Sequence, residues 1–156
     1  MKNTLIILVV ISVVIFSASG CSRGPYPAPM TQGAEKIVKV ELIDARGERE
    51  LFDGDYDEYI LYTLKTEEIQ PFIEKLESLE FRIPMLEPVR ILGDLAVWIY
   101  YEDGRSDLIG MYSNWSFDAE YNTLVRGVEY LNDNMAFHTL FCEYVDPALL
   151  PAVKTT

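Results

Sequence analysis

Residues 94–112 read DLAVWIYYEDGRSDLIGMY and contain the clearest structural unit of the chain. Its centre, Asp103-Gly104, is a strong β-hairpin signal, because both residue types accept the positive φ angles of a tight turn. The residues on each side are rich in β-branched and aromatic types, which favour strands. We therefore predict two antiparallel strands, at 94–101 and 105–112. The first is apolar on both faces, so we expect the hairpin to lie in the centre of a sheet.

A two-residue turn at this position also predicts how the two strands pair. It places Glu102 opposite Arg105, so that opposite charges meet beside the turn. Farther from the turn, the expected pairs are Ile99 with Leu108, Trp98 with Ile109, and Val97 with Gly110. Apolar residues then lie opposite apolar residues, which supports this register.

The segments around the hairpin are expected to supply further strands. Residues 36–44 alternate apolar and polar side chains, which is typical of a strand. Residues 58–64 are rich in Tyr, Ile and Thr and are expected to pair back on them. Residues 81–90 contain two prolines and suit an irregular or edge segment. Residues 115–121 and 123–131 are expected to add one or two strands.

Residues 66–80 are predicted to form a helix, because their apolar side chains fall on one stripe. Thr66 can cap this helix. Alternatively, the regular helix begins nearer Gln70, so that Pro71 occupies its first position. The stripe consists of Ile69, Phe72, Ile73, Leu76 and Leu79.

Residues 132–146 are predicted to form a second helix, which Asn132 or Asp133 can cap and Pro147 ends. Its apolar stripe consists of Phe137, Leu140, Phe141 and Tyr144.

The order of these elements predicts the α+β class in one domain over residues 34–147. We expect an antiparallel sheet of about four to six strands with both helices packed on one face. The other face, left exposed, would be the natural surface for interactions. Residues 148–156 are expected to form a loose tail.

The beginning of the chain has the pattern of a secretory signal. Lys2 supplies a positive charge, residues 5–16 are almost entirely apolar, and small residues lead into Cys21. The apolar run is shorter than the roughly 20 residues that a membrane-spanning helix needs.

The small residues before Cys21 resemble the lipobox of bacterial lipoproteins. Ser19 and Gly20 fit that pattern, whereas Ala18 stands where leucine is commonest. The resemblance implies cleavage between Gly20 and Cys21 and a diacylglyceryl group on the Cys21 thiol, so that the membrane is a partner through this lipid. In a cell with two membranes, Ser22 implies the outer one. An ordinary signal peptide and an uncleaved anchor are the alternatives.

A spacer is expected between the lipid and the domain. Residues 21–33 contain three prolines and two glycines and are predicted to form a flexible connection. An extended chain of this kind from residue 22 to residue 32 would reach roughly 30 Å. The domain behind it resembles small uncharacterised lipoprotein domains of bacteria in general layout, and that resemblance implies no activity.

Composition limits the partners and the chemistry of the chain. Removing residues 1–20 from the 156 leaves 136, which suits a single domain. The net charge of −12 argues against a nucleic-acid partner, because such binding rewards Lys and Arg. With lipid on Cys21, Cys142 is the one remaining thiol, so an intramolecular disulfide is not expected.

No catalytic residue, metal site or cofactor is predicted. The stretch DGDYDE at 53–58 resembles the start of a calcium loop, but Glu58 and Leu64 stand where an EF-hand needs glycine and glutamate. A solvated acidic turn is the preferred interpretation, and a weak irregular calcium site is the alternative. His138 and Cys142 lie one helical turn apart, but a cysteine in an apolar helix usually acts as a small buried hydrophobe.

Aromatic side chains near the hairpin are the candidate binding residues. Trp98, Tyr100 and Trp115 would form a platform for a peptide or a glycan if the sheet exposed them. The alternative is that they pack in the core. We therefore expect a membrane-anchored, non-catalytic module outside the cytoplasm that binds an envelope protein or a glycan. A small carboxylate-dependent hydrolase and an acidic inhibitor or immunity-type protein are the other candidates.

Overall fold

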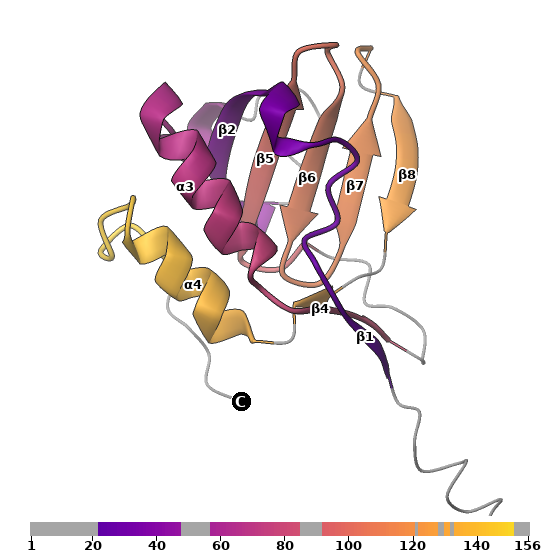
Figure 1. The fold of residues 1–156 in the computed structure, drawn as a ribbon. Helices are drawn as coiled ribbons and strands as arrows, with labels where there is room; N and C mark the ends of the chain where they lie inside the picture. Colours follow the sequence, from indigo (N-terminus) through magenta and orange to yellow (C-terminus); the bar gives the residue numbers. More distant parts are fainter. Residues whose placement is uncertain are drawn as a thin grey trace, which may run out of the picture.

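The chain folds into a mixed α+β structure with two antiparallel sheets. The computed structural model describes residues 22–47, 57–84, 92–120, 122–127, 130–131 and 133–151. Within this part, the large sheet has six strands in the order β3-β2-β5-β6-β7-β8, and the small sheet has the order β1-β4-β9 (Figure 1). The large-sheet strands are β2 (Ile37–Asp44), β3 (Ile60–Thr63), β5 (Leu95–Tyr101), β6 (Ser106–Gly110), β7 (Asn114–Phe117) and β8 (Thr123–Gly127). The small-sheet strands are β1 (Ser22–Tyr26), β4 (Phe81–Pro84) and β9 (Tyr130–Leu131).

Both predicted helices are present and lie on one face of the large sheet. They are α3 (Thr66–Glu77) and α4 (Asn134–Cys142), and Figure 1 shows them side by side on that face. Short 3-10 helices precede β2, follow β2 and precede β3; they are η1 (Ala34–Lys36), η2 (Ala45–Gly47) and η3 (Asp57–Tyr59). The expected α+β class, with two helices packed on one face, is therefore confirmed.

The first helix starts at its earliest predicted position. The carboxylate of Glu68 accepts hydrogen bonds from the Lys65 backbone N–H at 2.9 Å and from the Tyr62 hydroxyl at 2.9 Å. These bonds satisfy a free donor at the helix start, as glutamate does in a capping box. Lys65 rather than Thr66 is the N-cap residue, and Pro71 lies inside the helix. The alternative start near Gln70 was therefore wrong.

The second helix is capped as expected, but the chain after it is not loose. The Asp133 carboxylate accepts from the backbone N–H groups of Met135 and Ala136, at 2.9 and 3.3 Å. The helix ends at Cys142, earlier than predicted. Beyond it, Leu150 packs into the main core. The expectation of a loose tail was therefore wrong for residues 148–151, and residues 152–156 lie outside the described part.

The hairpin forms, but its strands pair one residue away from the predicted register. Trp98 lies opposite Leu108, and Val97 lies opposite Ile109. The turn is a three-residue loop, which the Tyr101 N–H closes by donating to the Arg105 carbonyl at 2.9 Å. Gly104 takes the left-handed conformation, with φ +85°, that ends such a loop. The predicted two-residue turn was therefore wrong, and this shift moves the Asp107 side chain to the face that carries the helices.

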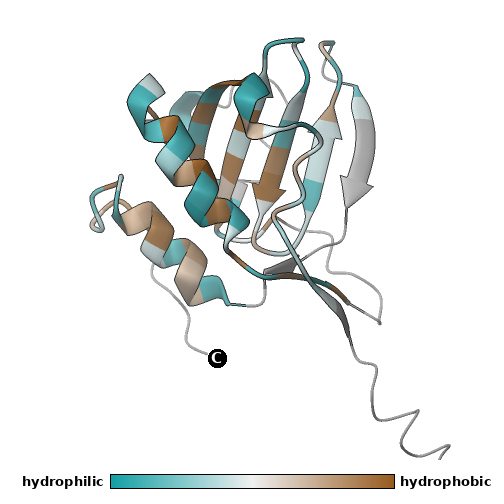
Figure 2. Ribbon diagram, viewed as in Figure 1, coloured by the Kyte–Doolittle hydropathy of each residue, from teal (hydrophilic) through white to brown (hydrophobic). Residues whose placement is uncertain are grey.

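The large sheet is covered on both faces. The helix side holds the main core, to which β2, β5, α3 and α4 contribute. The reverse side holds a second buried cluster around Ile43, Ala96, Trp98 and Leu108. Figure 2 shows hydrophobic residues on the central strands and a hydrophilic outer side of α3. The expected exposed sheet face is therefore largely a second core.

From Ser22 onward, the predicted flexible spacer is instead part of the fold. Residues 22–26 form β1, which pairs antiparallel with β4. Residues 27–33, which we call the strap, then cross the helix side of the large sheet in front of β6 and β7 (Figure 1). Ala28 is buried, and Met30 packs against the main core. The strap thus covers a part of the face that α3 and α4 leave open.

A buried carboxylate holds the strap. Asp107 of β6 is fully buried and accepts a hydrogen bond from the Thr31 backbone N–H at 2.6 Å. The Thr31 hydroxyl lies 2.9 Å from both carboxylate oxygens, and the Tyr101 hydroxyl donates at 2.6 Å. Burial, together with the bond to Asp107, raises the pKa of Tyr101 above its usual value. These bonds compensate for removing a carboxylate from water.

The next strap residue reaches the hairpin turn. The Gln32 side chain donates to the Asp103 carboxylate at 3.0 Å, and the Arg105 guanidinium donates to the same group at 2.8 Å. The hydrogen bond from Arg105 and then the bond from Gln32 hold the pKa of Asp103 well below its usual value. Two successive strap residues are therefore bound by two aspartates of the hairpin.

Replacing Asp107 should loosen the strap and destabilise the domain. In Asp107→Asn, one acceptor oxygen becomes a donor that faces the donors of Thr31 and Tyr101. We expect a loss of about 2–3 kcal/mol in the free energy of unfolding, the range for hydrogen bonds to a buried charged group. Urea unfolding measures this loss, and Glu102→Gln, an exposed change in the same hairpin, serves as the control. Equal stability of the two variants would contradict the role of Asp107 in holding the strap.

Candidate functional site

The three predicted aromatic residues do come together, and a fourth joins them. On the reverse face of the sheet, Trp98 stacks on Tyr100, with ring centroids 5.6 Å apart and planes at 11°. Phe117 lies 6.0 Å from Trp98 and 6.4 Å from Trp115, the latter pair being nearly parallel at 8°. The rings form a continuous row across β5, β6 and β7. Sequence reasoning missed Phe117, although it lies two residues from Trp115 and therefore on the same face.

The middle of this aromatic row is core rather than surface. Trp98 is only 3% exposed and Phe117 only 4%. Tyr100 and Trp115, at the two ends, are half-buried and pack against the second cluster. The row therefore serves mainly as cross-strand packing, with two partly accessible ends.

A polar corner adjoins the Tyr100 end of the row. Glu41, only 3% exposed, accepts a hydrogen bond from the Tyr100 hydroxyl at 2.8 Å. Lys39 forms an ion pair with Glu41 at 2.8 Å, and its ammonium lies 4.4 Å from the centroid of the Tyr100 ring. Each polar group of this corner is thus engaged by a neighbour, which keeps the buried carboxylate satisfied.

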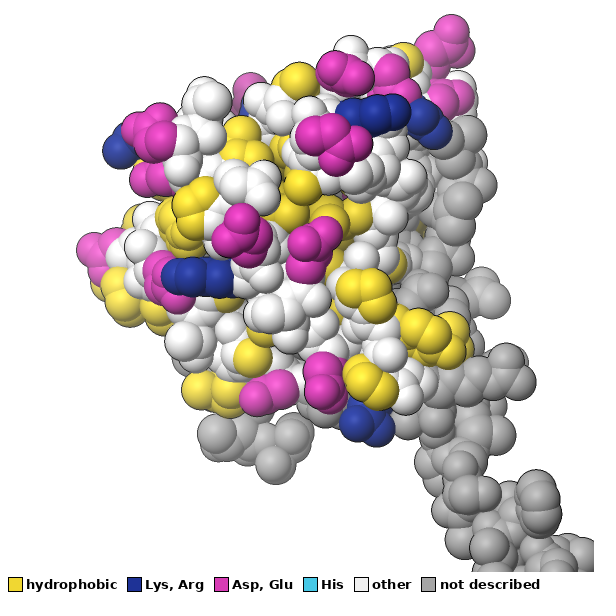
Figure 3. All heavy atoms as spheres, viewed as in Figure 1, with side chains coloured by type: hydrophobic (Ala, Val, Ile, Leu, Met, Phe, Trp, Pro, Cys, Tyr) yellow, Lys and Arg dark blue, Asp and Glu magenta, His cyan; other side chains and the backbone are white. Residues whose placement is uncertain are grey.

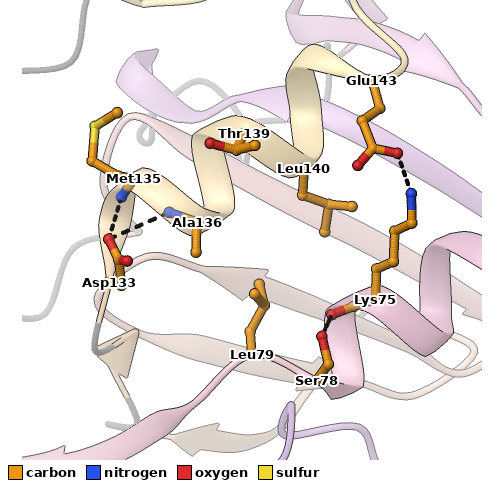
Figure 4. A pocket seen from close by; sticks show the side chains of 9 residues that line it. All are labelled: Lys75, Ser78, Leu79, Asp133, Met135, Ala136, Thr139, Leu140 and Glu143. Carbon is orange, nitrogen blue, oxygen red and sulfur yellow. Dashed lines mark hydrogen bonds and ion pairs between the residues drawn. The ribbon is translucent and has the colours of Figure 1, made fainter.

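A groove between the two helices is the second candidate. It has a volume of about 360 Å³, within the range of small ligand sites. In Figure 4, Leu79 of the chain after α3 and Leu140 of α4 point toward each other across the gap. Lys75 and Glu143 form an ion pair at the rim. The remaining lining residues are Ser78, Asp133, Met135, Ala136 and Thr139.

The floor of the groove is apolar, and acidic residues lie near it. Met135 at its edge is 48% exposed, and methionine adapts its shape to varied apolar partners. The helix α3 carries Glu67, Glu68, Glu74 and Glu77 against one basic residue, Lys75. The hydrogen bond that Lys75 donates to Glu143 raises the pKa of Lys75, so this ammonium stays charged and paired at neutral pH. Figure 3 shows apolar side chains framed by acidic ones on this side of the molecule.

The groove could not be found from the sequence. Its lining residues come from segments more than 50 residues apart, and their apolar members belong to the ordinary stripes of two amphipathic helices. Only the way in which α3 and α4 pack creates the space. The local sequence carries no signal of it, because the exposure of Met135 is seen only in the structure.

The buried carboxylates do not form a catalytic pair. Among the described residues, the buried acids are Glu41 and Asp107. Glu41 lies opposite Trp98 and Asp107 lies opposite Ile99, so their side chains lie on opposite faces of the sheet. Two carboxylates must flank one bond in a glycosidase-like site. These two cannot act together on one substrate.

The histidine and the cysteine of α4 are in contact. His138 Nδ1 lies 3.5 Å from Cys142 Sγ, as their spacing of one helical turn allowed, and both residues are half-buried. A sulfur–nitrogen contact at this distance between successive turns is adequately explained as a weak hydrogen bond within the helix.

Other expected features fall partly or wholly outside the described residues. Gly20 and Cys21 lie outside them, as do residues 53–56 of the acidic stretch, whereas Asp57 and Glu58 belong to η3. Within the described residues, no group of three His, Cys, Asp or Glu side chains is placed to hold a metal ion. No helix in the same residues is long and apolar enough to cross a membrane.

Comparison with known proteins identifies no family for this chain. No protein-family model, curated protein or solved structure matches this chain.

Proposed function

We propose that the chain is a lipid-anchored, non-catalytic binding module outside the cytoplasm that holds an envelope protein in the groove between α3 and α4. The groove is the observation that carries this proposal. Its floor is apolar, its volume of about 360 Å³ accepts one or two side chains, and its rim is polar. An apolar anchor in a pocket with a polar rim is the usual centre of a protein interface.

The charges around the groove indicate the chemistry of the partner. Two carboxylates, those of Asp133 and Glu143, line the groove. The helix α3 beside it carries four further acids, in a chain of net charge −12. Complementary charge steers association and excludes wrong partners. The expected partner is a protein segment that presents an apolar side chain with Lys or Arg beside it.

The leader supports the anchoring part of the proposal. The pattern of Lys2, an apolar run and small residues before Cys21 resembles the lipobox of bacterial lipoproteins. Two acyl chains hold a protein stably on a bilayer, whereas one holds it only marginally. A diacylglyceryl group on Cys21 would therefore keep the groove at the membrane surface.

Anchoring is tested by intact mass and membrane partitioning of the full chain expressed in a bacterium. We expect cleavage before Cys21, a mass increase equal to a diacylglyceryl group, and recovery in the membrane fraction. Cys21→Ala should remain unprocessed and lack the added mass, because the modified thiol is absent. A leader cleanly removed from an unmodified Cys21 would contradict lipid anchoring.

Binding in the groove is tested by photo-crosslinking in the cell. A photoreactive phenylalanine analogue replaces Thr139, which is exposed and lines the groove. We expect a discrete crosslinked protein that disappears in an Ala136→Arg background, because the added cation fills the groove and repels a basic partner.

Val38 provides the matched control for this experiment. It is 59% exposed on β2 and is not part of the groove lining. The photoreactive group at Val38 should not yield the same product, and Val38→Arg should leave the Thr139 product unchanged. Crosslinking that is equal from both positions, or insensitive to Ala136→Arg in a folded protein, would contradict the groove as the binding site.

A further inference from the structure

The junction between the proposed lipid and the domain has no free residues. Cys21 directly precedes β1, and Ser22, the first residue of β1, pairs with Pro84 of β4. The strap continues from β1 onto the sheet, where Thr31 is bound to Asp107. An unfolded connection of the same length could extend to roughly 30 Å. The folded strand and strap remove that freedom.

The start of β1 marks one end of the molecule. Figure 1 shows β1 and β4 extending together from the lower edge of the large sheet. The β5–β6 turn and the β7–β8 turn lie at the opposite end in the same view. Because strands are stiff along their length when paired, the position of Ser22 fixes which end of the domain lies nearest to Cys21.

The two ends also differ in charge. The strands β1 and β4 read SRGPY and FRIP, so they contain Arg23 and Arg82 and no acidic residue. The Arg82 guanidinium lies 3.9 Å from Glu80, just before the strand. At the other end, the two turns contain Glu102, Asp103, Asp118 and Glu120, of which Asp103 is paired with Arg105. Basic residues favour an anionic lipid surface and acidic residues oppose it.

From these observations we infer that the β1–β4 end of the domain docks on the phospholipid surface, so that the anchored domain has one orientation. This inference rests on the proposed lipid anchor at Cys21. The direct junction holds the β1–β4 end at the headgroups, and the acidic turns point away from the membrane. The N-terminal segment is thus a rigid connection between the lipid and the domain rather than a flexible linker.

The orientation is tested with nitroxide labels on the lipidated full chain in vesicles of phosphatidylcholine and phosphatidylglycerol. Cys142→Ala removes the native free thiol, and single cysteines are then introduced at exposed positions. Tyr26→Cys and Glu80→Cys report on the near end, and Glu102→Cys and Glu120→Cys report on the far end. A lipid with a nickel-chelating headgroup supplies the relaxing agent at the membrane surface.

We expect relaxation of the two near labels to be enhanced several-fold more than that of the two far labels. The matched control inserts about twelve Gly and Ser residues between Cys21 and Ser22, a flexible linker that spans about 20 Å on average. This insertion should bring the four labels to similar values.

The possible results distinguish a failure of the proposed orientation from a failure of the proposed lipid anchor. Four similar values with the native junction, on a protein whose mass shows the lipid, would overturn the orientation and leave the anchor standing. An unchanged contrast after the insertion would overturn the role of the direct junction. An unmodified Cys21 would overturn both the anchor and the orientation, and the mass of each sample shows this before any label is read.

Discussion

The fold depends on a carboxylate that is buried without a cationic partner at hydrogen-bonding distance among the described residues. Asp107, buried near the start of β6, would be costly if it were not hydrogen-bonded, and Thr31 and Tyr101 supply the donors. This arrangement explains why a polar residue occupies the helix side of a central strand. The helices do not cover that place; the strap does, and its backbone N–H needs an acceptor. Because these bonds hold the strap on the sheet, the N-terminal segment covers part of the core instead of acting as a linker.

The two faces of the sheet have separate roles. The reverse face closes over a second core in which Trp98 and Phe117 are almost fully buried, so its aromatic rings stabilise the sheet. The helix face carries a groove between α3 and α4 that is lined by Leu79 and Leu140. The surface that we propose for recognition therefore lies between the helices and not, as the aromatic composition suggested, on the sheet.

Local patterns in the sequence predicted the secondary-structure elements better than the way in which these elements pair and pack. Alternation and amphipathic stripes identified the central strands and both helices, and Asp133 was one of the two residues named as a possible cap. The hairpin register was missed because Asp103-Gly104 suits both a two-residue turn and the last part of a three-residue loop. The strap was missed because prolines and glycines indicate a linker unless a distant acceptor binds it, and Asp107 is 76 residues away from Thr31. The groove was missed because helix packing alone creates it.

Amide hydrogen exchange of Thr31, observed by NMR, tests whether the strap is bound to the sheet. Its N–H is the strap donor that the Asp107 carboxylate accepts, at 2.6 Å. We expect this amide to exchange far more slowly than the amide of an unstructured peptide, because its hydrogen bond to the buried Asp107 carboxylate must break before exchange can occur. Exchange at the rate of an unstructured peptide would show that the segment is a free linker and that Asp107 does not hold it on the sheet.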